Sequence, residues 1–346
     1  MVNAKKVVLG VSCGDINGIG IEIIIKTFLD NDLFSVCTPI LYAPESTIHD
    51  YKKCYNEFED FNCHIIKHAQ KAYPSKFNVI NFFNESVHVS FGSPTRQGAQ
   101  IALKSLDLAI EDLKRNTINV LLTLPVNKQN IATVQKDFIG HTEHLSKACD
   151  NKDNLMLLCH DKLKIATLTN HLPISKVANS ITKKSIKQKL NILIETLSVD
   201  FAIDTPKIAV LSLNPHAGDN GLIGDEDLNI LRPVIADFFD HGHLVYGPYS
   251  ADSFFGTGNY KNFDAILGMY HDQALVPFKL MSFGRGVNYT AGLPVIRVSP
   301  DHGVGYDIAG QNIAQTSSVL SSIFLGIQLY TNRKRDSSAT RKNCST

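Results

Sequence analysis

Three histidines in the sequence each follow a short apolar run at the point where the run ends. They are His171, His216 and His271, and the runs cover 163–169, 207–213 and 264–270. Ligands of open α/β sheets bind beyond the carboxyl ends of the strands, so residues at equivalent strand ends can meet. Three converging imidazoles would bind a divalent metal ion and leave a coordination position open for catalysis. A single histidine in such a position is more often a capping or packing residue, so the prediction depends on the fold.

A second group of residues is suited to binding an anion. The stretch 279–297 contains Lys279, Arg285 and Arg297 together with three glycines. Lysine and arginine form charge-assisted hydrogen bonds to phosphate or carboxylate, and glycine lets the backbone approach a ligand. A solvated surface loop is the alternative interpretation. The segment GHTEH at 140–144 is also polar, and its threonine could equally cap a helix.

The glycine-rich segment GDINGIGIE at 14–22 follows the first apolar run, where a dinucleotide-binding loop would lie. Its glycines have the spacing GxxxGxG rather than GxGxxG, so the segment does not match the dinucleotide fingerprint. The sequence also lacks a phosphate-loop lysine motif, a Gly-x-Ser-x-Gly elbow and a His-Glu-x-x-His motif. The signatures of these common enzyme classes are therefore excluded.

The apolar runs alternate with helical patterns along the chain. Further runs cover 6–12 and 118–124, and amphipathic helices are predicted over 97–114 and 182–198. Runs of Val, Ile and Leu without polar alternation are typical of strands buried on both faces. Strands that alternate with helices predict an α/β protein with a largely parallel sheet. Residues 51–95 are aromatic and irregular, and their elements cannot be assigned from the pattern.

The composition is that of an ordinary globular protein. The chain has 346 residues, of which 44% are hydrophobic, with 34 Lys+Arg against 33 Asp+Glu and a net charge of +1. This composition excludes intrinsic disorder and coiled coils. The balanced charge gives no electrostatic reason to expect a nucleic acid or an anionic membrane as a partner. At this length two domains are expected.

Cysteines and apolar segments indicate the compartment. The seven cysteines are scattered without a CxxC pair, so neither a disulfide framework nor a finger-type zinc site is expected. The N-terminal apolar run breaks at Gly14 and Asp15, too early for a signal peptide or a membrane span. We therefore expect a cytoplasmic protein with free thiols. The basic, Ser/Thr-rich segment 333–346 is expected to be a frayed, flexible tail.

Taken together, the motifs resemble those of one known family. GDINGIGIE, LPVNK, GHTEHL, NHLPISKV, LNPHAGDNGLIGDED, GPYSADSFF, MYHDQALVPFK, FGRGVN, GLPVIR and DHGVGYDIAG occur in the order of the family's counterparts. Over about residues 5–330 the chain resembles the 4-hydroxythreonine-4-phosphate dehydrogenases of vitamin B6 synthesis. That family is similar in fold to the isocitrate and isopropylmalate dehydrogenases.

The resemblance implies a two-domain α/β fold with largely parallel sheets and an active site in the inter-domain cleft. One domain, on the cofactor side, would consist of residues 1–135 and 275–332. The central domain, 136–274, would carry the metal and dimer side, and 333–346 would be the flexible tail.

The resemblance also implies roles for individual residues. The metal ligands would be His171, His216 and His271, shared across a homodimer interface. The substrate-binding positions would be His141, Thr142, Lys279, Asn288 and Arg297. Two acidic residues match positions with catalytic roles, Asp252 and Asp272. The cofactor-binding positions, by analogy with the fold, would be Asp301, His302, Gly303 and Asp307.

The implied reaction is oxidation of 4-phosphooxy-L-threonine to 2-amino-3-oxo-4-phosphooxybutanoate, which loses CO2 to give 3-amino-2-oxopropyl phosphate. The implied cofactors are NAD or NADP and one divalent metal ion per site (Zn, Mg, Co or Mn). A sister dehydrogenase acting on 4-phosphothreonate or 4-phosphoerythronate would share the motifs. An acyl-phosphate-forming transferase of the phosphate acetyltransferase type would share the fold class, although it has no use for three metal-binding histidines.

Overall fold

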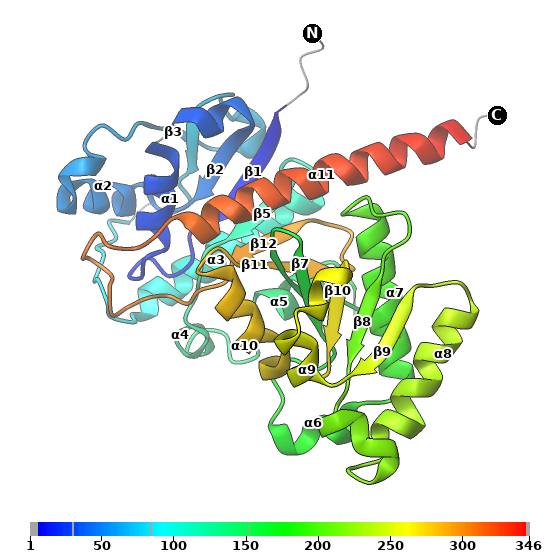
Figure 1. Ribbon diagram of the computed structural model, residues 1–346. Coiled ribbons are helices and arrows are strands. Elements are labelled where there is room, and N and C mark those ends of the chain that lie inside the picture. The colour runs from blue at the N-terminus through cyan, green and yellow to red at the C-terminus, as the bar shows by residue number, and fades with distance from the viewer. Residues whose placement is uncertain (1–5, 30, 84, 152, 344–346) are drawn as a thin grey trace. The chain divides into compact units, whose positions relative to one another are not determined.

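A computed structural model describes residues 6–29, 31–83, 85–151 and 153–343 (Figure 1). The chain divides into two compact units, which we call unit 1 and unit 2. Unit 1 consists of Met1–Lys152 and Leu293–Tyr330, and unit 2 of Asp153–Gly292 and Thr331–Thr346. The sequence analysis placed the boundaries after residues 135, 274 and 332, whereas the units change after residues 152, 292 and 330.

Hydrophobic packing explains why the first two boundaries lie after residues 152 and 292 rather than after 135 and 274. Leu145, on a helix just after the first predicted boundary, belongs to the same core as Leu106 and Ile110 of unit 1. Phe278, just after the second predicted boundary, packs in a core with Leu211 and Ile266 of unit 2. The cores in which these side chains are buried therefore determine where each unit ends, and they differ from the boundaries that the family resemblance implied.

Unit 1 is built on a sheet in which every described strand pair is parallel. Its strand order is β3-β4-β2-β1-β5-β12. The bounds are β1 Val7–Ser12, β2 Cys37–Tyr42, β3 Cys63–Ile66, β4 Phe77–Ile80, β5 Val120–Thr123 and β12 Arg297–Pro300. Most of these strands are buried along their length, as expected for strands covered on both faces.

The helices of unit 1 follow its strands in the manner of α/β units. They are α1 Gly20–Leu29, α2 Glu45–Cys54, α3 Arg96–Lys114, α4 Lys128–Ala132 and α5 His141–Ala148, with short 3-10 turns at Asn31–Ser35, Asn56–Phe58 and Ala69–Lys71. The predicted helix over 97–114 is confirmed as α3, and it begins where Oγ1 of Thr95 accepts a hydrogen bond from the Gly98 amide. The segment without a prediction, 51–95, contains two strands that are too short to show a period.

Unit 2 has a mixed sheet with the order β11-β6-β7-β10-β8-β9. The pairs of β6 with β7 and β11 are antiparallel, and the remaining pairs are parallel. The bounds are β6 Leu155–His160, β7 Leu163–Thr167, β8 Ile208–Leu211, β9 Val245–Tyr249, β10 Ala265–Gly268 and β11 Val287–Ala291. The expected α/β class with a largely parallel sheet is confirmed.

The helices of unit 2 cover its sheet. They are α6 Ile174–Ser180, α7 Lys183–Val199, α8 Arg232–Asp240, α9 Ala251–Gly256 and α10 His271–Ser282, with shorter turns at Pro215–Gly221, Asp227–Leu231 and Asn259–Asn262. The predicted helix over 182–198 is confirmed as α7, and a capping box of Thr182 and Ser185 closes its first turn. Helix α7 contacts β6 and β11, whereas α10 contacts β7 and β10.

The segment expected to fray continues the last helix instead. Helix α11 runs from Ser317 to Asn343, and its residues from Thr331 onward belong to unit 2. The Arg333 guanidinium donates hydrogen bonds to the Asp200 carboxylate and, over 2.9 Å, to the Tyr289 hydroxyl. Asp200 and Tyr289 are buried, so this ion pair holds the segment from Thr331 onward within unit 2. Residues 344–346, which include Cys344, lie outside the described part of the chain.

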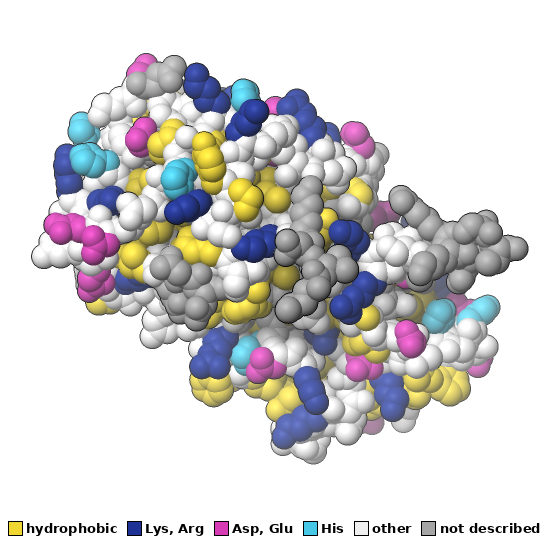
Figure 2. Space-filling view, turned by 90° about the horizontal axis from the view of Figure 1, so that it is seen from above, with side chains coloured by type: hydrophobic (Ala, Val, Ile, Leu, Met, Phe, Trp, Pro, Cys, Tyr) yellow, Lys and Arg dark blue, Asp and Glu magenta, His cyan; other side chains and the backbone are white. Residues whose placement is uncertain are grey.

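The distribution of charge, the helices and the cysteines can be compared with what the composition predicted. Figure 2 shows Lys and Arg side chains scattered among acidic and neutral ones over the face that it presents, without a single basic patch. Among the described residues, no helix is both long enough and apolar enough to cross a bilayer. The six cysteines that the structure describes are free thiols.

Candidate active site

Unit 1 brings the buried Arg297 and His141 into one cluster. Arg297 is the first residue of β12, and Nε and Nη2 of its guanidinium donate to Oγ1 of Thr123, at the end of β5, over 2.9 and 2.6 Å. The residue is only 4% exposed. Burial lowers the pKa of Arg297 to about 10, and the nearby Glu143 carboxylate opposes that shift. Arg297 therefore remains a cation at neutral pH and is suited to binding an anion.

His141 begins α5 beside this cation, and its Nε2 atom is buried. Desolvation lowers the pKa of His141 well below its ordinary value, and the positive charges of Arg297 and Lys128 lower it further. Among the described residues, no hydrogen-bond partner reaches Nε2 of His141. A neutral imidazole with a buried, unpartnered nitrogen is suited to a hydrogen bond with a ligand.

Lys128 is a member of this cluster that the sequence analysis did not select. It begins α4, and a Cβ placed on Gly140 would lie 3.3 Å from its Nζ. Its charge acts on His141. The signal was present in the motif LPVNK, which ends in this lysine, but nothing in the spacing linked residue 128 to residues 141 and 297.

The expected cofactor segment packs against the glycine-rich loop at 14–22, within unit 1. The Ile19 amide donates to O of Val304 over 3.0 Å, and a Cβ on Gly18 would lie 2.6 Å from the same oxygen. The Tyr306 hydroxyl donates to Oδ2 of the buried Asp15 over 2.6 Å. The space that the missing side chain of Gly18 leaves is thus occupied by Val304 of the same chain. At Gly303, by contrast, a Cβ would meet no atom of the described chain within 4 Å.

Unit 2 brings together two of the three predicted metal ligands. The imidazole centroids of His171 and His271 are 5.7 Å apart, and both line a cavity of about 310 Å³. Nδ1 of His271 lies 2.7 Å from Oδ1 of Asp272. Because a carboxylate can only accept, this bond places the proton on Nδ1 and leaves the lone pair of Nε2 for a metal ion. The pair fits a metal-binding role, and Asp272 orients one of its members.

The third histidine, His216, lies in a different setting. It follows β8 in the turn Pro215–Gly221, and it acts on the carboxylate of Asp252. Hydrogen bonds from the Ser250 hydroxyl and the Ser253 amide, together with the charge influence of His216, hold the pKa of Asp252 below its ordinary value. Among the residues that the structure describes, no three His, Cys, Asp or Glu side chains form a group that could hold a metal ion. One chain therefore brings two of the predicted ligands together and leaves His216 apart from them.

The remaining predicted residues of unit 2 are distributed over α10 and β11. Lys279 lies on the exposed face of α10, and Asn288 is the second residue of β11. Oδ1 of Asn288 is buried, and no hydrogen-bond partner in the described chain reaches it. This buried acceptor is a second polar atom, besides Nε2 of His141, that a ligand could satisfy.

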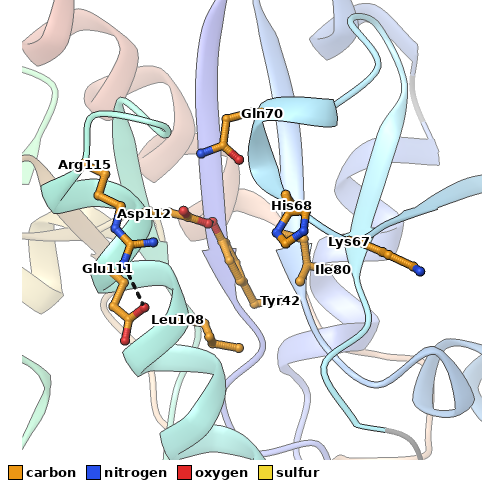
Figure 3. Close-up of a pocket in the computed structure, with 9 residues that line it drawn as sticks. All are labelled: Tyr42, Lys67, His68, Gln70, Ile80, Leu108, Glu111, Asp112 and Arg115. Carbon is orange, nitrogen blue, oxygen red and sulfur yellow. Dashed lines mark hydrogen bonds and ion pairs between the residues drawn. The ribbon is translucent and has the colours of Figure 1, made fainter.

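Another pocket in unit 1 holds none of the predicted residues (Figure 3). Its volume is about 150 Å³, and α3 and the strand ends of β2, β3 and β4 surround it. Its lining residues are Tyr42, Lys67, His68, Gln70, Ile80, Leu108, Glu111, Asp112 and Arg115. The Tyr42 hydroxyl donates to Asp112 over 2.8 Å, and Arg115 pairs with Glu111 over 3.8 Å. The charges of this pocket are thus largely paired within the chain, and it is not part of the candidate active site.

Comparison with known proteins gives the class first. The chain is 42% identical to a 4-hydroxythreonine-4-phosphate dehydrogenase of Bacteroides thetaiotaomicron, over 97% of this chain and 92% of the relative. It is 37% identical to one from a Sulfurihydrogenibium species, over 94% and 99%. A crystal structure of the Klebsiella pneumoniae enzyme superposes with a TM-score of 0.82 at 30% identity and covers 95% of this chain and 99% of that one. The chain is therefore an oxidoreductase, a dehydrogenase with an α/β fold.

A family model then identifies which dehydrogenases these are. The model for the pyridoxal phosphate biosynthetic protein PdxA matches residues 35–326. The chain belongs to this family, the 4-hydroxythreonine-4-phosphate dehydrogenases of pyridoxal phosphate biosynthesis. The resemblance stated from the sequence motifs is confirmed, and a dehydrogenase family implies a nicotinamide cofactor.

Proposed function

We propose that the chain oxidises 4-phosphooxy-L-threonine at C3 with NAD or NADP, in a reaction that depends on a divalent metal ion. The product, 2-amino-3-oxo-4-phosphooxybutanoate, then loses CO2 to give 3-amino-2-oxopropyl phosphate. The observation that carries this proposal is the buried Arg297 cation beside the neutral His141, whose Nε2 has no partner in the described chain. Such a pair suits a phosphorylated substrate better than a neutral one.

The residues of unit 1 bind and orient the substrate in this proposal. Arg297 and Lys128 supply positive charge to an anionic group, and His141 adds a neutral hydrogen bond. Thr142, beside His141 at the start of α5, belongs to the same binding segment. Fixing a substrate in the reactive geometry contributes several kcal/mol to the lowering of a barrier. The backbone at Gly303, flanked by Asp301, His302 and Asp307, offers the cofactor an open approach.

The residues of unit 2 hold the metal ion and the remaining substrate contacts. Nε2 of His271, which carries the lone pair in the tautomer that bonds to Asp272, and the neighbouring His171 are two ligands, and His216 is the third. When bound, a divalent ion supplies Lewis-acid chemistry, which lowers the pKa of an alcohol and stabilises negative charge on oxygen. Asn288, through its buried oxygen, and Lys279 are further substrate contacts.

The proposed reaction is an oxidation at C3 followed by a decarboxylation. In the first step the C3 hydride passes to the nicotinamide and the C3 hydroxyl loses its proton, so a ketone forms. In the second step the bond to the carboxylate breaks, CO2 leaves, and its electron pair forms an enolate that takes up a proton. Asp252, whose lowered pKa keeps it ionised at neutral pH, is suited to accept a proton rather than to donate one.

We also propose that two copies of the chain complete the metal site. His171 and His271 lie together in one chain, whereas His216 lies near Asp252, so the partner subunit would supply the missing ligand. Helix α10 adds support, because Val276 and Leu280 on its exposed face and Phe283, which caps its C-terminus, are 56%, 68% and 84% exposed. A group of exposed apolar side chains is suited to packing against a second protein surface. Free thiols support a reducing, cytoplasmic location.

Turnover of the purified protein tests the reaction. NADH or NADPH formation should be rapid with 4-phosphooxy-L-threonine, slower with 4-phosphothreonate and 4-phosphoerythronate, and abolished by a chelator. A faster reaction with a tetronate would identify the sister activity. Turnover that persists in chelator would contradict the metal-dependent mechanism.

Mixing two inactive variants tests the shared site. His216→Ala and His271→Ala homodimers each lack one ligand in both sites. In a mixed dimer one site lacks two ligands and the other is complete, so activity should return to about half of the wild-type value per dimer. If heterodimers form and no activity returns, all three ligands come from one chain.

A further inference from the structure

The turn that carries His216 has an unusual backbone conformation. The φ angles from His216 to Asn220 are 52°, 53°, 74°, 42° and 55°, which places five consecutive residues in the left-handed region. Of these residues only Gly218 is a glycine. A left-handed conformation costs a non-glycine residue about 1–2 kcal/mol. The turn therefore persists only because the surrounding chain holds it.

A buried carboxylate holds the entry to this turn. Asp227, the first residue of the segment Asp227–Leu231, is fully buried. Its Oδ1 accepts a hydrogen bond from the Leu213 amide over 2.8 Å, and its Oδ2 accepts one from the Asn214 amide over 2.9 Å. The carboxylate thus fixes the two residues that precede the turn.

Further contacts close the turn against the same segment. The Asn214 side chain donates to Oε2 of Glu226 over 2.8 Å. The Ile223 amide donates to O of Gly218 over 3.0 Å, and a Cβ on Gly218 would lie 2.7 Å from O of Gly224. The close approach at Gly218 leaves no room for a larger residue, so the turn and the segment 224–227 form one packed unit.

We propose that Asp227 is a positioning residue for His216. By accepting both amides, it fixes the backbone that leads into the left-handed turn, and the turn in turn directs the imidazole toward the metal ion. Without the carboxylate, the strained residues could relax to right-handed or extended conformations and move the imidazole. This inference rests on the proposed role of His216 as a metal ligand.

Co2+ titration of the metal-free protein, followed by its visible absorption, tests the inference without relying on turnover. Asp227→Asn keeps the shape of the side chain but presents an amide group to one of the two N–H donors. It should weaken Co2+ binding by about 10–100-fold, as loss of a partner that orients a ligand does. The matched control is Asp200→Asn, which alters a buried carboxylate of the same unit whose hydrogen bonds go to Tyr289 and Arg333. The control should bind Co2+ as the wild type does, at equal folded fraction by circular dichroism.

A second variant covers the case in which Asp227→Asn does not fold. Glu226→Ala removes only the bond to the Asn214 side chain, at a half-buried position, and should weaken Co2+ binding in the same direction by a smaller factor. Wild-type affinity in folded Asp227→Asn, or in Glu226→Ala if the former is unfolded, would overturn the positioning role while leaving the metal site intact. If His216→Ala binds Co2+ as tightly as the wild type, the ligand assignment itself is wrong, and the positioning role fails with it.

Discussion

Unit 1 buries two polar groups that we assign to the substrate, the Arg297 guanidinium and Nε2 of His141, whereas unit 2 leaves His271 and Asp272 of the proposed metal site partly exposed. Arg297 is 4% exposed and bonded to Thr123, and the buried Nε2 of His141 belongs to the same cluster. In unit 2, by contrast, the side chains of His271 and Asp272 are 37% and 78% exposed. The fold of unit 1 alone fixes its residues, so their loss should affect both stability and function. The residues of unit 2 await a metal ion or a second chain, so their loss should affect function alone.

The largest effect is expected where unit 2 does bury a charge, away from its assigned residues. Arg333→Ala leaves the buried Asp200 without its guanidinium and should lower the free energy of unfolding by about 3 kcal/mol, the cost of breaking a buried ion pair. Urea unfolding followed by circular dichroism measures this change. Arg335→Ala, at an exposed position of the same helix, is the control and should be near neutral.

The same variant tests whether stability and function are separate in unit 2. Arg333→Ala should keep the Co2+ affinity of the wild type at temperatures where it is folded. A metal affinity that falls in step with stability would show that unit 2 does not differ from unit 1 in this respect.

The next effect concerns the buried cation of unit 1. Arg297→Ala removes a charge-assisted contact worth about 1.5–3 kcal/mol and should raise KM for the phosphorylated substrate by about 10–100-fold. Because the cation is buried, urea unfolding should also show a loss of stability. Arg285→Ala, an exposed arginine, should change neither quantity. An unchanged KM in Arg297→Ala would remove this residue from the substrate site.

The smallest effect concerns the pH dependence that His141 gives to unit 1. The folded protein keeps His141 neutral because its pKa lies well below 6.5, whereas the unfolded chain takes up a proton near that pH. The unfolded state therefore binds more protons as the pH falls, and stability that is present above pH 6.5 is lost below it. His141→Gln should reduce the slope of unfolding free energy against pH by up to about 1.4 kcal/mol per pH unit in this range.

Two measurements check this prediction. Urea unfolding at several pH values gives the slope, and the NMR signals of the His141 ring should show no titration between about pH 6 and 7. A ring that titrates near pH 6.5 would mean that His141 is not desolvated. The two units would then differ less in how deeply they bury their polar groups.

The sequence predicts the strands and helices of this fold better than the contacts between residues that are far apart in the chain. The runs of buried Val, Ile and Leu mark β1, β5, β7, β8 and β10, because parallel strands covered on both faces require continuous apolar residues. The basic segment after residue 332 was predicted to fray, because its apolar residues do not recur at a helical spacing. The bond from Arg333 to Asp200 links residues far apart in the chain, and no local pattern reports such a pair.

The candidate site shows the same division. Motif matching supplied His141, Arg297 and the three histidines, and strand ends alone pointed to the histidines. Lys128 and Asp227 were missed because their roles arise from three-dimensional neighbours, Gly140 in one case and the amides of Leu213 and Asn214 in the other. The convergence of all assigned residues on one substrate remains a prediction.

The order of synthesis gives the C-terminal helix a further consequence. Unit 1 takes β12, with Arg297, and the first part of α11 from residues 293–330, and unit 2 takes Arg333 from the segment after them. Domains generally fold as units while the chain emerges from the ribosome. Here neither unit has its full set of residues until the last helix has been made. A nascent chain stalled before residue 297 would lack the cation of one unit and the partner of Asp200 in the other, so the folding of both units waits until residues 297–333 have been made.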